Sequence, residues 1–193
     1  MGTLGYRRNG LGRWQRQGQF GSTGTAADAL PDQSGKLRLN RHNFVALNPR
    51  IDFYVLARPA PNGRLRLACR VTEKAYRAGH RIHLLTQDEP QANTLDDLLW
   101  TFSQSSFIPH SLATQASDVD TPPPVLVGSQ LPAPASVDTL ISLAGEPIDS
   151  YAEFERIAEI VGAEDEERLA GRQHYRFYRE HGLTPNTHTI SPH

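Results

Sequence analysis

From Ile51 onwards, apolar and polar positions follow a pattern that predicts a regular succession of strands and helices. Short runs rich in β-branched and aromatic residues predict strands, and longer runs with apolar positions three or four residues apart predict helices. The predicted strands are residues 51–57, 81–86, 125–127 and 140–143, with a short extended piece at 107–109. The predicted helices are residues 65–78, 90–102, 151–161 and 164–181, and surface loops are predicted at 113–124 and 129–135. Because strands and helices alternate, the pattern predicts a three-layer α/β/α sandwich with a mainly parallel sheet.

The first part of the chain lacks this pattern. Residues 1–48 are rich in Gly and Arg, show no sustained apolar period and are expected to form a disordered basic extension, whereas residues 49–193 form a single α/β domain. Residues 1–50 hold eight basic and two acidic side chains, against 12 basic and 19 acidic side chains in the remainder. Two interpretations of the extension stay open: a basic tail that contacts nucleic acid, or a start site placed too far upstream. The acidic body argues against nonspecific binding to duplex DNA.

The amino-acid composition excludes several classes of protein for this chain. The chain has one cysteine, Cys69, which excludes an intrachain disulfide framework and a cysteine-rich zinc site and fits a reducing, cytoplasmic compartment. Because Cys69 lies in the middle of a predicted helix beside apolar neighbours, we expect it to be buried rather than nucleophilic. No apolar run approaches the roughly 18 residues that a membrane-spanning helix needs, so no membrane partner is expected.

A search for catalytic chemistry finds no reaction centre. The loop at residues 58–63 has neither a dinucleotide fingerprint nor a phosphate-binding loop, and its two prolines lack the N–H donors that a pyrophosphate would need, so no cofactor is expected. His80 and His83 lack a third metal ligand nearby, so no metal is expected. His110 has no nucleophile or acid paired with it by a known motif. Asp52 fits two readings, a functional carboxylate or a cap for a neighbouring loop.

The last predicted helix carries a row of cationic side chains. Four residues at spacings of four, three and four fall on one narrow stripe: Arg168, Arg172, Tyr175 and Arg179. Arg176 flanks this stripe, which contains no acid. Because guanidinium groups fork two hydrogen bonds to a carboxylate or phosphate, the stripe is a candidate anion-binding surface. The alternative is a solvated helix face without a ligand. Three residues on the other faces of this helix are expected to pack inward: Leu169, Ala170 and Phe177.

Five short segments occur in an order that is shared with one known family. They are FYVL at 53–56, AGHRI at 78–82, LDDLLW at 95–100, SFIPH at 106–110 and YRFYR at 175–179. Together with Gly182 and the Asn186-Thr187 pair, they resemble the chi subunit of bacterial DNA polymerase III over about residues 50–190. The LDDLLW and SFIPH segments are the most specific part. The basic extension has no counterpart in that family.

The resemblance implies a Rossmann-like fold without a bound nucleotide and a non-catalytic accessory role at the clamp loader of the replisome. It also implies three protein partners: single-stranded-DNA-binding protein, a small psi-like subunit and a repair helicase, with DNA contacted only indirectly. The acidic C-terminal tail of single-stranded-DNA-binding protein ends in aspartates and an aromatic residue with a free carboxylate. The rival hypothesis is an α/β enzyme that binds a small ligand or nucleotide in the crevice of its sheet.

The resemblance also assigns residues to two surfaces. On the last helix, Arg172 would bind the terminal carboxylate or an aspartate of the tail, and Tyr175 would form a wall of the pocket for its aromatic residue. Arg168 and Arg176 stand where the family has basic residues, often lysine, and Arg179 belongs to the same YRFYR segment. Four other residues resemble the psi-facing surface: Trp100, Phe107, Pro109 and His110. For Phe107, packing in the core is an equally good reading.

Overall fold

The computed structural model describes residues 48–104, 107–116 and 121–191, together with two short strands, β1 (Tyr6–Arg8) and β2 (Trp14–Arg16). β1 and β2 pair antiparallel in a unit that spans Met1–Asn40, and a second unit spans Arg41–His193. The sequence pattern did not predict these two strands. The rest of the segment expected to be disordered lies outside the described residues.

The second unit is built around one sheet of seven parallel strands in the order β5-β6-β4-β7-β8-β3-β9. The strands are β3 (Arg50–Leu56), β4 (Ile82–Leu85), β5 (His110–Leu112), β6 (Val125–Gly128), β7 (Thr139–Ser142), β8 (Arg156–Val161) and β9 (Asn186–Ile190). The helices are α1 (Gly63–Arg77), α2 (Glu89–Thr101), α3 (Ala113–Ala116) and α4 (Asp165–Glu180), with short 3₁₀ turns η1 (Pro134–Ser136) and η2 (Tyr151–Glu153).

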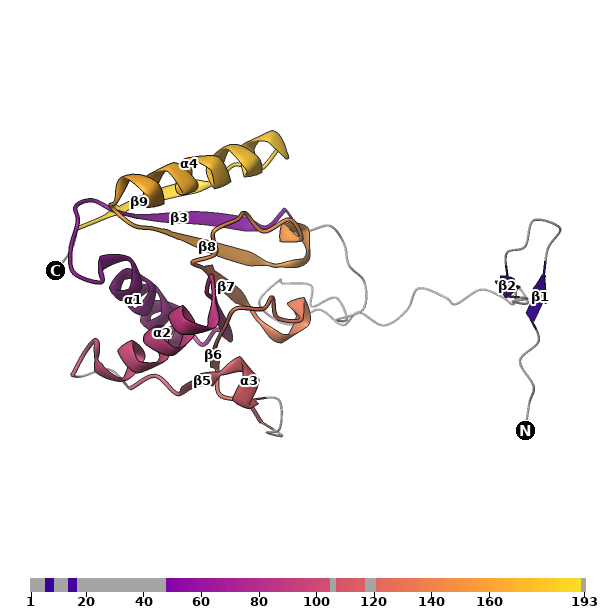
Figure 1. The fold of residues 1–193 in the computed structure, drawn as a ribbon, viewed down its shortest axis with the longest axis horizontal. Helices are drawn as coiled ribbons and strands as arrows, with labels where there is room; N and C mark the ends of the chain where they lie inside the picture. The colour runs from indigo at the N-terminus through magenta and orange to yellow at the C-terminus, as the bar shows by residue number, and fades with distance from the viewer. Residues whose placement is uncertain (1–5, 9–13, 17–47, 105–106, 117–120, 192–193) are drawn as a thin grey trace, which may run out of the picture. The chain divides into compact units, whose positions relative to one another are not determined.

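Helices cover both faces of this sheet. In Figure 1, α4 lies on one side of β3 and β8, and α1 and α2 lie on the other. The core on the α4 side is centred on Phe53, Ile157 and Tyr178. The core on the side of α1 and α2 is larger and includes Leu67 and Leu95. The predicted three-layer α/β/α sandwich with a Rossmann-like sheet is therefore confirmed, and all seven of its strands are parallel. In the described part of the chain, no helix is long and apolar enough to cross a bilayer.

One predicted helix is wrong. Residues 151–161 form the short turn η2 followed by strand β8, instead of a continuous helix. Residues 157–161 are all buried, which is typical of a parallel strand covered on both faces. The buried Glu159 interrupts the apolar run, so the sequence looks like an amphipathic helix. Only the tertiary structure supplies the partners that allow a carboxylate at this position.

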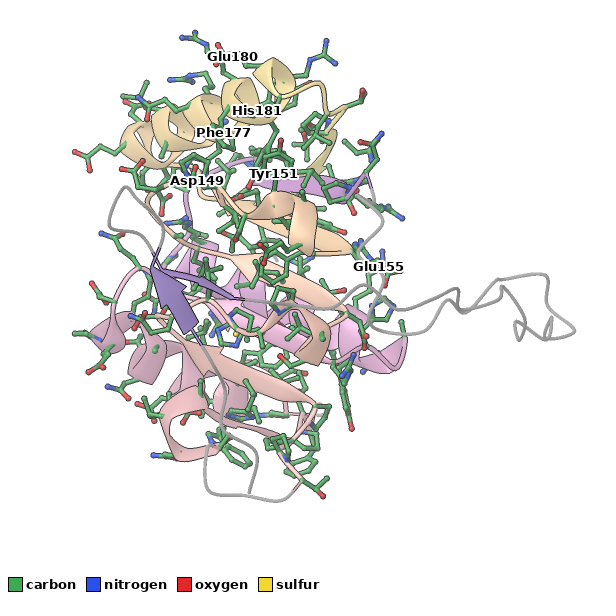
Figure 2. All side chains as sticks on the ribbon, turned by 90° about the vertical axis from the view of Figure 1, so that its right-hand side faces the viewer. Asp149, Tyr151, Glu155, Phe177, Glu180 and His181 are labelled. Carbon is green, nitrogen blue, oxygen red and sulfur yellow. The ribbon has the colours of Figure 1, made fainter. Side chains whose placement is uncertain are left out.

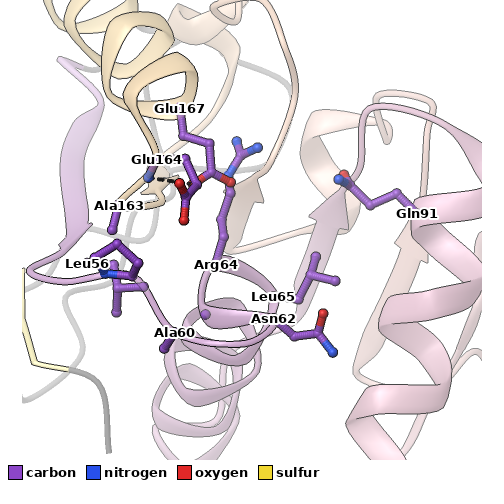
Figure 3. Close-up of a pocket in the computed structure, with 11 residues that line it drawn as sticks. Leu56, Ala60, Asn62, Arg64, Leu65, Gln91, Ala163, Glu164 and Glu167 are labelled. Carbon is purple, nitrogen blue, oxygen red and sulfur yellow. Dashed lines mark hydrogen bonds between the residues drawn. The ribbon is translucent and has the colours of Figure 1, made fainter.

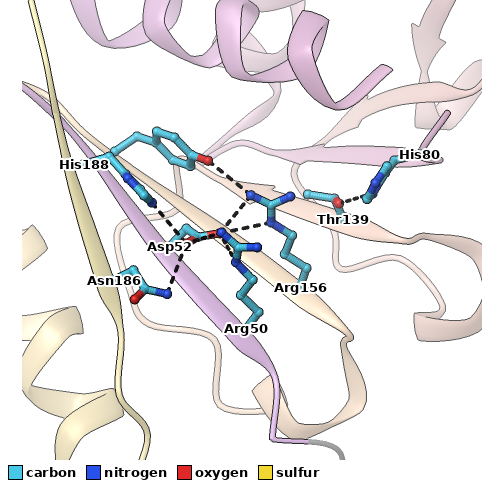
Figure 4. A network of polar contacts seen from close by, with 8 residues as sticks. Arg50, Asp52, His80, Thr139, Arg156, Asn186 and His188 are labelled. Atoms are coloured by element: carbon cyan, nitrogen blue, oxygen red, sulfur yellow. Dashed lines mark hydrogen bonds and ion pairs between the residues drawn. The ribbon is translucent and has the colours of Figure 1, made fainter. Parts of the chain in front are cut away.

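The edge strand β9 was not predicted, because its sequence, NTHTI, is polar and mostly exposed. A buried carboxylate holds it to β3. Two residues of β9 contact the Asp52 carboxylate (Figure 4). His188 Nε2 lies 3.2 Å from Asp52 Oδ1, and Asn186 Nδ2 donates to the same oxygen at 3.4 Å. Arg50 Nε and Arg156 Nη2 each lie 2.8 Å from Asp52 Oδ2.

Asp52 is fully buried, so neither reading offered by the sequence fits: it holds neighbouring strands together. Burial alone would raise the pKa of Asp52. The hydrogen bonds from His188 and Arg50 and the charge of Arg156 outweigh burial and lower this pKa. The ionised carboxylate is therefore favoured in the folded chain.

Smaller differences concern strand ends and loops. The extended piece expected at 107–109 precedes the strand, which begins at His110. The two predicted loops contain the short helix α3 and the turn η1. Cys69 is completely buried in α1, as expected, and burial raises the pKa of its thiol to about 12.

Candidate functional site

Helix α4 begins with reciprocal caps and packs closely on the sheet. The Glu164 side chain accepts from the backbone of Glu167, whose own carboxylate accepts from Glu164 N, and this capping box fixes the first turn. At Gly171 an added Cβ would lie 2.8 Å from both methyl groups of Val161 on β8. Glycine here lets the helix approach the strand directly. The buried residues of the helix are Gly171, His174 and Tyr178.

A buried network of hydrogen bonds connects the inner face of α4 to the sheet. The Tyr178 hydroxyl donates to Glu159 Oε1 at 2.7 Å, and His174 Nδ1 lies 3.3 Å from Glu159 Oε2. His174 Nε2 lies 3.0 Å from Gly145 O, and Ile148 N donates to the Tyr178 hydroxyl at 3.3 Å. Burial would lower the pKa of His174, but the bond to Glu159 and its charge raise this pKa. The network fixes α4 to β8 and to the loop that precedes η2.

Aromatic rings cluster at the C-terminal end of α4. Figure 2 shows Tyr151, Phe177 and His181 gathered at this end. The ring centres of Phe177 and His181 are 4.3 Å apart, and Tyr151 contacts both rings edge-on. Phe177 is partly buried, as expected. The expectation for Leu169 is wrong, because 52% of this residue is exposed.

The cationic stripe borders a pocket of about 230 Å³ between α4 and the sheet. Phe53 and Val55 of β3 and Val161 of β8 give it an apolar lining. The ring of Tyr175 stands edge-on to Phe53, with centres 5.5 Å apart. The remaining lining residues are Arg168, Gly171, Arg172 and Thr187. The pocket therefore combines an apolar interior with a cationic rim.

The arginines of α4 are not equivalent. Arg168 is partly buried, and its Nε donates to Ala163 O at 3.0 Å while its Nη2 donates to the carbonyls of Leu56 and Ala57, both at 3.2 Å. By contrast, Arg172, Arg176 and Arg179 are exposed, and none of the three has an ion pair with any residue that the structure describes. Of the five predicted residues, Arg168, Arg172 and Tyr175 line the pocket, and Arg176 and Arg179 lie outside that lining.

The residues of the second predicted surface also lie together. Trp100, at the end of α2, is 55% exposed, and Phe107 is 70% exposed. Their ring centres are 5.9 Å apart, and the His110 ring lies 4.6 Å from Trp100. His110 itself is buried, with its ring nitrogens 2.7 Å from Ile108 O and 3.1 Å from Asp96 O. Pro109 is partly buried.

The exposure of Phe107 rules out the core-packing reading within this unit. Trp100 and Phe107 thus form an exposed apolar patch, which is a common feature of protein–protein contacts.

The crevice of the sheet holds a larger pocket of about 350 Å³, shown in Figure 3. It lies where α/β proteins usually bind their ligands. Glu164 and Glu167 line it, and the Arg64 side chain extends toward Glu167. Arg64 Nε donates to Ile160 O at 2.9 Å. Two carboxylates and one occupied guanidinium group do not suit a phosphate. Among the described residues, no group of three His, Cys, Asp or Glu side chains could hold a metal ion.

Known proteins match this chain over most of its second unit. The family model of the DNA polymerase III chi subunit, HolC, matches residues 49–186. DNA polymerase III subunit chi of Pseudomonas aeruginosa is 41% identical over 141 residues, which cover 73% of this chain and 96% of that protein. Subunit chi of Escherichia coli is 32% identical over 123 residues, covering 64% of this chain and 83% of that protein. Subunit chi of Haemophilus influenzae is 25% identical over 138 residues, covering 72% and 95%.

The chain belongs to the DNA polymerase III chi subunit family. Membership of the chi family implies a role in DNA replication and confirms the resemblance read from the sequence. The matched region begins at residue 49, two residues before Ile51, where the regular apolar pattern begins.

Sequence reasoning found the cationic rim of the pocket beside α4 and missed its interior. Phe53 and Val55 alternate on β3, so the period of a strand places them on one face, but nothing local shows that α4 covers this face. Val161 was assigned to a helix. Thr187 belongs to the unpredicted strand β9.

Proposed function

We propose that this chain is a non-catalytic subunit of DNA polymerase III that binds the acidic C-terminal tail of single-stranded-DNA-binding protein in the pocket beside α4. The observation that carries the proposal is the combination at one site of an apolar interior and an exposed arginine without an acidic partner among the described residues. Capture of a C-terminal carboxylate together with an apolar anchor is an established mode of peptide recognition.

Each part of the tail has a complementary part of the site. The aromatic side chain of the tail enters the pocket, against Phe53 and Val55, with Tyr175 as its wall. Arg172 at the rim forks hydrogen bonds to the terminal carboxylate or to an aspartate. Arg176 and Arg179, farther along the exposed face, attract the remaining aspartates. Each charge-assisted bond contributes roughly 1.5–3 kcal/mol before the costs of association, so a few bonds and one buried ring correspond to micromolar affinity.

Arg168 has a different part in this proposal. Because its Nε and Nη2 already donate to backbone carbonyls, it holds the end of β3 against the start of α4. Its positive charge also favours an anion at the rim. Arg168 therefore acts mainly by fixing the shape of the pocket.

The proposed action is mechanical. A subunit that holds the clamp loader and also holds protein-coated single-stranded DNA raises the local concentration of polymerase there, without a reaction of its own. This activity needs no cofactor. It belongs in the cytoplasm, at the replisome on the nucleoid.

A titration of fluorescently labelled acidic-tail peptide, followed by anisotropy, tests the site. We expect micromolar binding that weakens as salt is added, and at least a tenfold loss of affinity in Arg172→Ala. The matched control is Arg77→Ala, which removes an exposed arginine from α1 on the other face of the sheet and should bind as the wild type does. Equal affinity in Arg172→Ala and wild type would remove the assigned site.

The exposed patch of Trp100 and Phe107 supports a second contact, with a psi-like clamp-loader subunit. Large aromatic side chains are frequent centres of protein–protein interfaces. We expect Trp100→Ala to reduce co-purification of such a subunit strongly while leaving tail-peptide affinity unchanged. A repair helicase is a third proposed partner, and competition between the helicase and the psi-like subunit would show that they share this patch. Undiminished co-purification of both partners with Trp100→Ala would contradict the assignment.

A further inference from the structure

Helix α1, on the opposite face of the sheet from α4, carries its own row of cations. Arg66, Arg70 and Lys74 recur every four residues, which places them about 6 Å apart along one side of the helix. Arg66 and Lys74 are exposed, and Arg70 is partly exposed. Glu73 is the one acid of α1, and it also lines the pocket beside Arg66 and Arg70. Its carboxylate pairs with Arg77 at 2.7 Å, outside the row, so the three cations of the row outnumber the acid of their helix.

A pocket of about 240 Å³ opens beside this row. Arg66 and Arg70 lie at the pocket, and Leu56, Leu67 and the partly buried ring of Phe102 supply apolar lining. Phe102 follows the last residue of α2, so the pocket lies between α1 and the end of α2. The surface thus places an aromatic ring next to a line of positive charges.

We propose that the row Arg66–Arg70–Lys74, with Phe102, binds single-stranded DNA directly. Surfaces that bind single strands combine cations that follow the phosphates with aromatic rings on which bases stack. The row continues past the pocket to Lys74, which suits an extended polyanion better than the single terminal carboxylate of a peptide. Membership of a DNA polymerase subunit family selects DNA as the strand.

The local charge explains how an acidic body binds a polyanion. Short-range attraction depends on the cations within about a Debye length of the phosphates, near 8 Å at physiological salt, rather than on the net charge of the domain. Along α1 the balance is five basic side chains to one acidic side chain. Arg70 Nη1 also donates to Ser191 O at 3.4 Å, just after β9, which holds the middle of the row in place.

This surface and the pocket beside α4 lie on opposite faces of the sheet, so both can be occupied at once. A chain that holds the acidic tail of a DNA-coating protein on one face and a stretch of bare strand on the other gains from bivalent attachment. DNA binding by α1 does not depend on tail binding, and separate titrations measure the two.

The test uses the full chain and fluorescein-labelled oligothymidylate, with anisotropy read over a series of salt concentrations. The triple variant R66Q/R70Q/K74Q removes three charges while glutamine keeps a long side chain and good helix propensity. We expect at least a tenfold loss of affinity at low salt. The slope of log K against log salt should become shallower by about two, because each phosphate contact on a single strand contributes about 0.7.

A matched control removes the same charge from the other face. R172Q/R176Q/R179Q should lose the tail peptide and keep its affinity for oligothymidylate, whereas R66Q/R70Q/K74Q should keep the tail peptide. Equal loss of DNA affinity in the two triple variants would overturn the proposal, because net charge would then explain the binding. Loss of tail peptide in R66Q/R70Q/K74Q would also overturn it, because the surface would then bind acidic peptides.

Two further variants separate the remaining explanations. Phe102→Leu keeps an apolar side chain but removes the ring, and it should weaken DNA binding while leaving the salt slope unchanged. R7Q/R8Q/R13Q/R16Q neutralises part of the basic extension within the full chain. Loss of DNA binding in this variant, combined with wild-type binding in R66Q/R70Q/K74Q, would place the DNA contact in the extension and overturn the proposal.

Discussion

Arginines at the amino ends of the strands and arginines on α4 show two uses of the same side chain. Arg50 and Arg156 both bind the buried carboxylate of Asp52, and the resulting cluster holds β3, β8 and β9 together. Arg172 and Arg176 on α4 are exposed and have no ion pair with a described residue. The difference lies in whether a buried acid is within reach. Where it is, arginine supports the fold, and where it is not, arginine is available to another molecule.

The acid Glu159 lies between α4 and the sheet, but its carboxylate is bonded to residues other than arginine. Glu159 accepts from the Tyr178 hydroxyl and faces His174, so its two oxygens already have partners on the inner face of the helix. This arrangement stabilises the helix without neutralising its outer face. Two buried carboxylates therefore stabilise the same sheet in different ways, and only one of them uses arginine.

The largest effect is expected at the strand ends. Asp52→Asn leaves Arg50 and Arg156 without their buried partner, and we expect a loss of about 3 kcal/mol in the free energy of unfolding, measured with urea. Asp97→Asn, an exposed acid on α2, is the control and should change stability by less than about 0.5 kcal/mol. A loss in Asp52→Asn no larger than in the control would show that the cluster does not support the fold.

The cluster around Asp52 also predicts how the stability of the fold depends on acidic pH. Because the pKa of Asp52 is lowered on folding, its stabilisation is present above the unfolded pKa of about 4 and is lost as the pH falls through the folded value. Asp52→Asn should therefore lose less stability than the wild type as the pH falls below about 4. Parallel pH profiles for the two proteins would contradict this assignment.

A smaller effect is expected beneath α4. Tyr178→Phe removes the hydroxyl that donates to Glu159 and accepts from Ile148 N, so we expect a loss of about 2 kcal/mol in unfolding free energy. Tyr151→Phe removes an equivalent hydroxyl from the neighbouring aromatic cluster and serves as the comparison. If both variants unfold at the same urea concentration, the hydrogen bond from Tyr178 to Glu159 does not contribute measurably to the free energy of unfolding.

His174 gives the α4 network a pH dependence of opposite sign to that of Asp52. Its pKa is raised on folding, so its stabilisation is complete below the unfolded value of about 6.5 and is lost as the pH rises through the folded value. We expect the wild type to lose more stability than His174→Gln between neutral and mildly alkaline pH. Urea midpoints measured across that range provide the test, and equal losses would contradict it.

The smallest effect on stability is expected from the exposed arginines. Alanine at Arg172, Arg176 or Arg179 should change the free energy of unfolding by no more than about 0.5 kcal/mol. A loss above about 1 kcal/mol in Arg172→Ala would place this residue among the arginines that support the fold, and its tail-binding loss would then need another explanation.

The same contrast explains what the sequence could predict. The helical period alone located the rim residues, because Arg172, Tyr175 and their neighbours share one face at fixed spacing. It could not locate Glu159 as part of a strand, because the partners that permit a buried carboxylate come from a helix 15 to 19 residues away. Strand β9 was missed for a similar reason. Its polar residues are stabilised by Asp52, which lies more than 130 positions earlier in the chain.

The buried thiol of Cys69 has a practical consequence for all of these measurements. With its pKa raised to about 12 and no exposed surface, this cysteine has almost no thiolate at neutral pH and should resist alkylating dyes. Because the chain has no second cysteine, a cysteine introduced at an exposed position would be the sole site of labelling. Spectroscopic probes can therefore be attached to a cysteine introduced near α1 or near α4 without first replacing Cys69.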